Sequence, residues 1–127
     1  MNRLAACALA AMLPLTGCVR QTTLDTAKTA RAEGDVSTLA TALTVYESLA
    51  HRFPSSEQGL QSLVARPTTG PLPAAWTQQL SELPLDPWGE AYRYVQPGVH
   101  NPTAFDIYSA GPDKRPGTED DIGNWQK

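Results

Sequence analysis

Cysteine is almost absent from this 127-residue chain, which holds only Cys7 and Cys18, so a disulfide-stapled scaffold is excluded. Long hydrophobic runs are also missing. The longest, residues 4–15, is too short to span a bilayer, which excludes a multi-span membrane protein. Basic residues are few: Lys and Arg number 10 against 13 Asp and Glu, for a net charge of -3. Such a balance argues against nucleic acid as a partner, because phosphate contacts require dense Lys and Arg.

Signatures of catalysis are missing as well. The two histidines, His51 and His100, lie far apart, and neither has a cysteine or a second histidine at metal-ligand spacing. The sequence contains no G-x-S-x-G motif and no phosphate-binding loop. Ser55 is better explained as a helix cap than as a nucleophile. Asp86 and Asp106 are interpreted as a turn residue and an outward-facing strand residue. We therefore expect a protein that is not an enzyme.

Proline and glycine are plentiful by contrast, with 11 and 9 residues, and they favour a loop-rich half over a helical bundle. Hydrophobic residues make up 41% of the chain and charged residues 18%. That composition is sufficient for one modest core, and so for a single folded domain.

The first segment has the layout of a secretory signal peptide, with one positive charge at Arg3 followed by the apolar residues 4–15. It ends in Leu-Thr-Gly-Cys at residues 15–18, which resembles the lipobox of bacterial lipoproteins. In such proteins the cysteine is acylated and becomes the new N-terminus. The resemblance implies a signal peptide over residues 1–17 and lipidation of Cys18. The alternative is an ordinary signal peptide with an incidental cysteine.

This resemblance also implies a location. A lipid on Cys18 would anchor the chain in the cell envelope, facing the periplasm. Val19 is not the aspartate associated with inner-membrane retention in enteric bacteria, so the outer membrane is favoured. Residues 18–34 are then the lipidated N-terminus and either a tether or the start of a helix. For residues 20–29 the helix is preferred over the tether, and both interpretations stay open.

A long helix is predicted over residues 24–51, with Gly34 as a weak point inside it. Its apolar residues fall on one stripe at helical spacing, while several threonines lie off the stripe. The stripe comprises Val36, Leu39, Ala40, Leu43, Tyr46 and Ala50. Phe53-Pro54 is expected to end the helix, because the residue before a proline is pushed out of the α region.

The remaining chain reads as short elements. Ser55 and Gln58 form a possible capping box for a short helix over residues 55–65. Residues 86–89 (DPWG) are typical of a turn, and scattered apolar anchors precede them: Trp76, Leu80, Leu83 and Leu85. Residues 91–95 and 105–109 alternate as strands of a loose hairpin, with a third strand at 122–125. The predicted fold is α+β, with one long N-terminal helix packed on a small antiparallel sheet.

Five colinear segments resemble the major pseudopilin of bacterial type II secretion systems. They are residues 42–46 (ALTVY), 52–64 (RFPSSEQGLQSLV), 83–89 (LPLDPWG), 105–113 (FDIYSAGPD) and 121–125 (DIGNW). The second, third and fourth are similar to the family's FPTTEQGLQALV, LPKDPWG and FDIYSLGAD. The resemblance implies a pseudopilin-like domain over residues 35–127, and several motifs in order are far more specific than any one of them.

The N-terminus departs from this family, whose members begin with a prepilin leader followed by a long hydrophobic helix. We therefore expect a lipid-anchored, non-catalytic pseudopilin-like subunit of a type II secretion system, with other pseudopilins or secretion components as partners. This hypothesis predicts an exposed apolar stripe on the N-terminal helix, left for a partner to cover. The alternative is a free-standing periplasmic binding lipoprotein that uses the fold outside the secretion machine.

The segment 113–121 (DKRPGTEDD) concentrates four acids in a Pro/Gly turn. From spacing alone it is either a solvated acidic turn or a calcium site, because Ca²⁺ takes carboxylate and carbonyl oxygens at about 2.4 Å. The family resemblance favours calcium. It implies coordination by the backbone carbonyls of Ala110 and Thr118 and by the carboxylates of Asp113, Asp120 and Asp121. The ion's role would be structural, locking the last loop onto the sheet.

Overall fold

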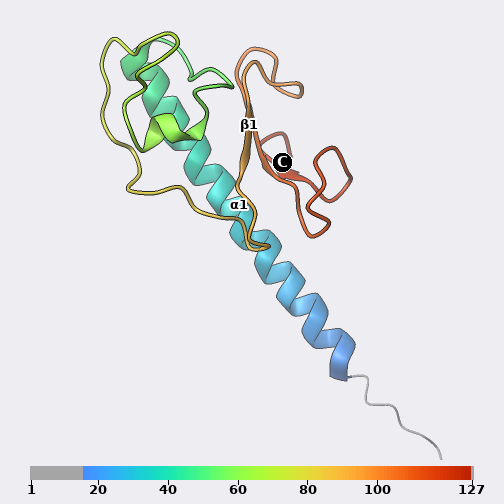
Figure 1. Ribbon diagram of the computed structural model, residues 1–127. Helices are drawn as coiled ribbons and strands as arrows, with labels where there is room; N and C mark the ends of the chain where they lie inside the picture. The colour runs from blue at the N-terminus through green and yellow to red at the C-terminus, as the bar shows by residue number, and fades with distance from the viewer. Residues whose placement is uncertain (1–15, 127) are drawn as a thin grey trace, which may run out of the picture.

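The computed structural model describes residues 16–126, with side-chain environments from residue 23 onward. One long helix, α1 (Thr16–Ala50), runs the length of the molecule, and its C-terminal half carries all the other elements. Its N-terminal half projects from this head as a stalk (Figure 1). The predicted signal peptide lies almost wholly outside the described residues.

The apolar stripe predicted on α1 is the face that packs into the head. Leu39 and Leu43 are 1% and 0% exposed, and the other members of the stripe are buried or partly buried. The threonines lie on the solvent face, as predicted, and Thr38, Thr41 and Thr44 each donate a hydrogen bond of 2.9–3.0 Å to the carbonyl four residues earlier. These bonds satisfy hydroxyls that would otherwise compete with the helix. The helix continues through Gly34, where a weak point was expected.

A three-stranded antiparallel sheet lies beside α1, in the order β1-β2-β3. Its strands are β1 (Arg93–Val95), β2 (Asp106–Ser109) and β3 (Ile122–Gly123). The register pairs Tyr94 with Ile107 across β1 and β2, and Ser109 with Ile122 across β2 and β3. The predicted α+β fold is thus confirmed, with strands slightly shorter than their patterns suggested.

The core lies between the stripe of α1 and the inner face of the sheet. Ile107 in the central strand and Leu63 from the short 3₁₀ helix η1 (Leu60–Leu63) are both 0% exposed. Burying an aliphatic side chain of this size contributes about 1.5–3 kcal/mol. Trp76, Leu80 and Leu83 pack against this core from the intervening loop, as predicted for anchors. Leu85 does not: it is 55% exposed, so its assignment as an anchor was wrong.

The end of α1 and the element after it differ from expectation. His51 adopts a left-handed φ of 60° and its N–H bonds to the Glu47 carbonyl at 2.8 Å, so the helix ends at Ala50, four residues before Pro54. The capping box exists, since Ser55 and Gln58 exchange reciprocal bonds of 3.0 and 3.1 Å. It caps no α-helix, because Gly59 with φ 61° breaks the backbone and only the 3₁₀ turn of η1 follows.

Candidate functional site

The acidic segment between β2 and β3 forms one folded loop, and its three predicted carboxylate ligands are neighbours in it. The Thr118 hydroxyl bonds to the Asp120 carboxylate and lies 3.4 Å from that of Asp121. The other Asp120 oxygen accepts the Asp113 N–H at 3.1 Å. Asp121 also accepts the Gly117 N–H at 2.8 Å. The loop therefore brings together the residues that the resemblance assigned to it.

The three proposed carboxylate ligands are not paired with the basic residues of the loop. Among the described side chains, none of Asp113, Asp120 and Asp121 forms an ion pair with Lys or Arg, and Lys114 reaches outward to Glu90 at 3.9 Å. Asp121 is only 7% exposed. The hydrogen bond from Thr118, together with bonds from the Asp113 backbone, holds the pKa of Asp120 below its usual value. The loop thus favours the ionised form of the Asp120 carboxylate.

The two residues predicted to coordinate through backbone carbonyls also belong to this loop. Ala110, 1% exposed, stands at its entrance, and the Thr118 carbonyl accepts the Asp121 N–H at 3.3 Å. Within the side chains of residues 23–126, no three His, Cys, Asp or Glu lie close enough together to hold a metal ion by themselves. Any ion in this loop would therefore depend on carbonyl oxygens as well as carboxylates.

A buried polar chain supports the loop from below, and sequence reasoning missed it. Asp86, interpreted as a turn residue, is 3% exposed and accepts the Ser109 hydroxyl at 2.6 Å. Ser109 in turn accepts the Gly111 N–H at 3.1 Å. The DPWG turn is thereby connected to the first residues of the acidic loop. The available signal was an Asp–Pro turn and a serine at an inward strand position, which sequence alone does not pair.

The hairpin loop between β1 and β2 is organised by a second buried carboxylate. Asp106 was expected to face outward, yet it is 2% exposed, and it accepts hydrogen bonds from the backbone N–H groups of Val99, His100 and Asn101. The side chain of His100 is half exposed and stacks on Trp125 with ring centroids 3.8 Å apart. The connection is therefore tightly fixed, where a loose hairpin was predicted.

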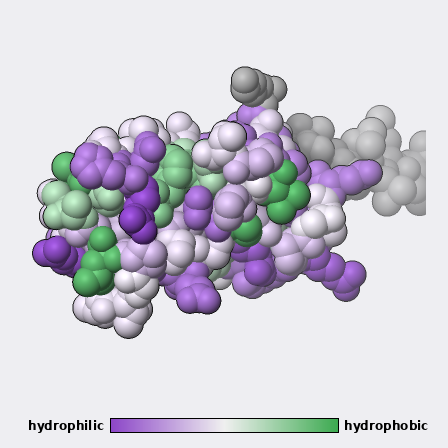
Figure 2. Space-filling view, turned by 90° about the horizontal axis from the view of Figure 1, so that it is seen from above, coloured by the Kyte–Doolittle hydropathy of each residue, from purple (hydrophilic) through white to green (hydrophobic). Residues whose placement is uncertain are grey.

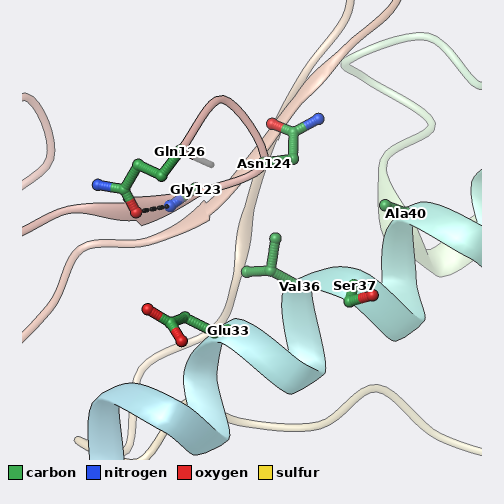
Figure 3. A pocket seen from close by; sticks show the side chains of 7 residues that line it. All are labelled: Glu33, Val36, Ser37, Ala40, Gly123, Asn124 and Gln126. Carbon is green, nitrogen blue, oxygen red and sulfur yellow. Dashed lines mark hydrogen bonds between the residues drawn. The ribbon is translucent and has the colours of Figure 1, made fainter. Parts of the chain in front are cut away.

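A shallow hollow of about 490 Å³ lies between α1 and the C-terminal turn after β3 (Figure 3). Glu33 and Val36 rise from α1 toward this turn, where Gln126 accepts the Gly123 N–H at 3.2 Å. Its lining mixes a carboxylate, amides and small apolar groups.

Exposed hydrophobic residues are scattered. On the face seen in Figure 2 they form separate small patches among polar residues. On the described part of the stalk, residues 23–31, Leu24 is the one large exposed hydrophobic side chain, at 60%. The continuous apolar stripe expected on the N-terminal helix is therefore absent from this part of α1.

Comparison with known proteins decides the family. Residues 21–125 match the family described as type II secretion system (T2SS), protein G. The chain belongs to the type II secretion system protein G family.

Relatives of this protein G family member include the type II secretion system core protein G of Pseudomonas aeruginosa. It is 44% identical over 106 residues, covering 80% of this chain and 73% of that protein. The core protein G of Escherichia coli K12 is 46% identical over 97 residues, covering 75% of this chain and 66% of that protein. For the Pectobacterium carotovorum protein, also 46% identical over 97 residues, coverage is 75% and 61%. The chain thus spans roughly two thirds of the length of these relatives.

A solved structure gives the same family. The crystal structure of the major pseudopilin from the type 2 secretion system of enterohaemorrhagic Escherichia coli superposes with a TM-score of 0.76 at 40% sequence identity. The match covers 83% of this chain and 88% of that one. The resemblance to the major pseudopilin drawn from sequence motifs is therefore confirmed.

These relatives also bear on the predicted function class and location of the protein G family member. They are named as core components of a secretion system, which confirms a structural, non-enzymatic role. Type II secretion pseudopilins are cell-envelope components, in agreement with the expected envelope location. Within residues 16–126, no helix is both long and apolar enough to cross a membrane.

Proposed function

We propose that this protein is a lipid-anchored, calcium-stabilised pseudopilin subunit of a type II secretion system. The pseudopilin part of the proposal is carried by the family match over residues 21–125, which includes most of α1, the sheet and the acidic loop. Its role is to make protein contacts within the secretion machine through the head and stalk. The match to named core proteins does not favour the alternative of a free-standing binding lipoprotein.

The membrane attachment rests on the lipobox-like residues 15–18. Because Cys18 lies within α1, an acylated Cys18 would stand at the N-terminal end of the stalk. With a rise of 1.5 Å per residue, the 14 positions from Cys18 to Ala32, the first buried residue among the described side chains of α1, would hold the head roughly 20 Å from the lipid. The stalk then takes the place of the hydrophobic half-helix by which family members are anchored.

Acylation is tested by metabolic labelling with an alkyne fatty acid. The Cys18→Ser variant should lose the label and leave the membrane fraction, whereas the matched Cys7→Ser variant should keep both. Equal labelling of the wild type and Cys18→Ser would refute the lipid anchor.

The calcium proposal rests on the donor set of the acidic loop. All its candidate ligands are hard oxygens, and three neighbouring carboxylates have no cationic partner among the described side chains, which fits Ca²⁺ in chemistry and charge. Bound Ca²⁺ would neutralise this cluster. The carboxylates of Asp113, Asp120 and Asp121 would hold the ion, together with the carbonyls of Ala110 and Thr118.

Calcium binding is tested by thermal unfolding of the full chain in mild detergent. At calcium a hundredfold above Kd, linkage predicts about 2.7 kcal/mol of added stability, so EGTA should lower the Tm. Asp113→Ala should abolish this response, and Asp25→Ala, which removes an exposed stalk carboxylate, should preserve it. An unchanged wild-type melting curve in EGTA would refute the calcium proposal.

Membership in the machine is tested by crosslinking the tagged protein in cells and identifying captured proteins by mass spectrometry. Recovery of other pseudopilins or of the secretin is expected. If an intact and abundant protein captures neither, the fold has been kept for another purpose and the proposed function fails.

A further inference from the structure

Ser109 occupies an unusual place at the foot of the acidic loop. It is the last residue of β2, it is 0% exposed, and its hydroxyl is used twice. The Oγ donates to the Asp86 carboxylate at 2.6 Å and accepts the Gly111 N–H at 3.1 Å. One side chain therefore links the sheet, the DPWG turn and the loop.

Asp86 gives Ser109 a fixed partner. Its other carboxylate oxygen accepts the N–H groups of Trp88 and Glu90 at 3.0 and 2.8 Å, which locks the carboxylate into its own turn. Hydrogen bonds to an ionised acceptor are shorter and roughly twice as strong as neutral ones. The Ser109 hydroxyl is thus held in a single orientation, with its lone pairs toward Gly111.

The direction of the Gly111 N–H sets the direction of a proposed ligand. The Ala110 carbonyl and the Gly111 N–H belong to one planar trans peptide, so they point in opposite directions. Because the N–H points at buried Ser109, the Ala110 carbonyl points away from Ser109.

Gly111 also lies close to Asp120. Its φ is 74°, and a Cβ at this position would overlap the Asp120 carbonyl oxygen and lie 3.1 Å from the Asp120 carboxylate. The backbone at residue 111 is therefore pressed against the residue that provides another proposed ligand. A shift of Gly111 would move both proposed ligands, the Ala110 carbonyl and the Asp120 carboxylate.

We propose that Ser109, held by Asp86, is the positioning residue that aims the Ala110 carbonyl at the ion and seats Asp120 against Gly111. The inference rests on the proposed calcium binding of this loop. It assigns to the DPWG turn, more than twenty residues away in sequence, a part in setting calcium affinity.

The test is calorimetric titration of CaCl₂ into the full chain in detergent at low temperature, where the variants remain folded. Ser109→Ala should weaken the calcium Kd about 10–100-fold, the usual effect of losing a group that orients metal ligands. The matched control is Ser62→Ala, which removes another buried serine hydroxyl, 2% exposed and bonded to the Gln58 carbonyl at 3.4 Å. Ser62→Ala should lower the calcium-free Tm and leave the Kd unchanged, which separates positioning from general stability.

The outcomes distinguish the two proposals. If the wild type binds calcium and Ser109→Ala binds within twofold of it, the positioning role is refuted and the calcium loop stands. If the wild type binds no calcium, both are refuted. Should Ser109→Ala not fold, Ser109→Cys keeps the volume and replaces the hydroxyl with a weak hydrogen-bonding sulfur, and the same Kd loss is expected.

Discussion

Asp106 offers the sharpest test of how the head is held together. One carboxylate oxygen accepts the N–H groups of Val99 and His100, each at 2.9 Å, and lies 3.0 Å from Nδ1 of His100. The other accepts the backbone and side-chain N–H groups of Asn101 at 3.0 and 3.1 Å. Five contacts thus converge on one buried acid, and they fix the whole β1–β2 connection.

The Asp106→Asn variant removes the charge and turns one acceptor into a donor. Whichever way the amide is placed, its NH₂ faces at least one backbone N–H, which is left unsatisfied at a cost of about 1–3 kcal/mol. Weakening of the remaining charge-assisted bonds brings the expected loss to about 2–4 kcal/mol. For a domain of this size, that loss lowers the Tm by roughly 8–16 °C.

The pH dependence of stability gives an independent readout. Burial would raise the pKa of Asp106, but the hydrogen bonds from His100 and Asn101 outweigh it and hold the pKa below the ordinary 3.8. A carboxyl with a depressed folded-state pKa adds stability that is present above its unfolded pKa and is lost as pH falls through the folded value. Asp106→Asn should therefore flatten the acid limb of the stability curve below about pH 4.

The assay is urea unfolding of the wild type, Asp106→Asn and Asp25→Asn between pH 7 and pH 2.5. Asp25→Asn makes the same change of charge at an exposed position on the stalk, and it should leave both midpoint and acid limb near those of the wild type. If Asp106→Asn loses less than 1 kcal/mol of stability at pH 7, or loses as much stability below pH 4 as the wild type does, the Asp106 carboxylate does not hold the β1–β2 connection in place.

Two further predictions concern the core and the end of α1. Tyr94 donates to the Pro54 carbonyl at 2.6 Å, whereas the buried Tyr46 hydroxyl has no hydrogen-bond partner among the described residues. Tyr94→Phe should therefore cost about 1–2 kcal/mol of stability, and Tyr46→Phe should be neutral or stabilising. Equal losses of stability for the two variants in urea unfolding would contradict this reasoning. The second prediction concerns His51, whose left-handed φ of 60° is strained for a residue that carries a Cβ. His51→Gly should raise the free energy of unfolding by about 0.5–1 kcal/mol, seen as a higher urea midpoint. A clear loss of stability would show that the His51 ring makes a contact worth more than the strain.

Local patterns predicted the parts of the fold that local physics determines. The stripe on α1 was readable because buried side chains must recur every 3.6 residues, and Leu39 and Leu43 lie at its centre with 1% or less exposure. The strands were readable from alternation, which places Ile107 inward and Tyr108 on the more accessible face.

Failures occurred where a local signal depends on a partner distant in the sequence. The Ser55–Gln58 box forms as predicted, but the backbone at Gly59 stops the helix that the box usually begins. Asp106 was assigned to solvent because strand acids usually face water. Its burial depends on N–H groups from the preceding loop, which folds back over it. The spacing of residues in the sequence does not predict these hydrogen bonds.

The acidic loop shows a similar division. Composition marked it as a place for calcium or for solvent, and the resemblance named its ligands. What positions those ligands, Asp86 and Ser109, was invisible, because a turn and a strand end separated by 23 residues meet only in the folded chain.

The segment from Leu85 to Tyr92 contacts both α1 and the strand end beneath the acidic loop. Arg31 on α1 donates to the Leu85 carbonyl at 3.1 Å, and the Tyr92 hydroxyl donates to Asp35 at 2.6 Å. Burial and then the bond to Asp35 raise the pKa of Tyr92, so the hydroxyl keeps the proton it donates. The same segment carries Asp86, which holds Ser109 beneath the acidic loop. One stretch of backbone therefore contacts both α1 and the serine beneath the acidic loop.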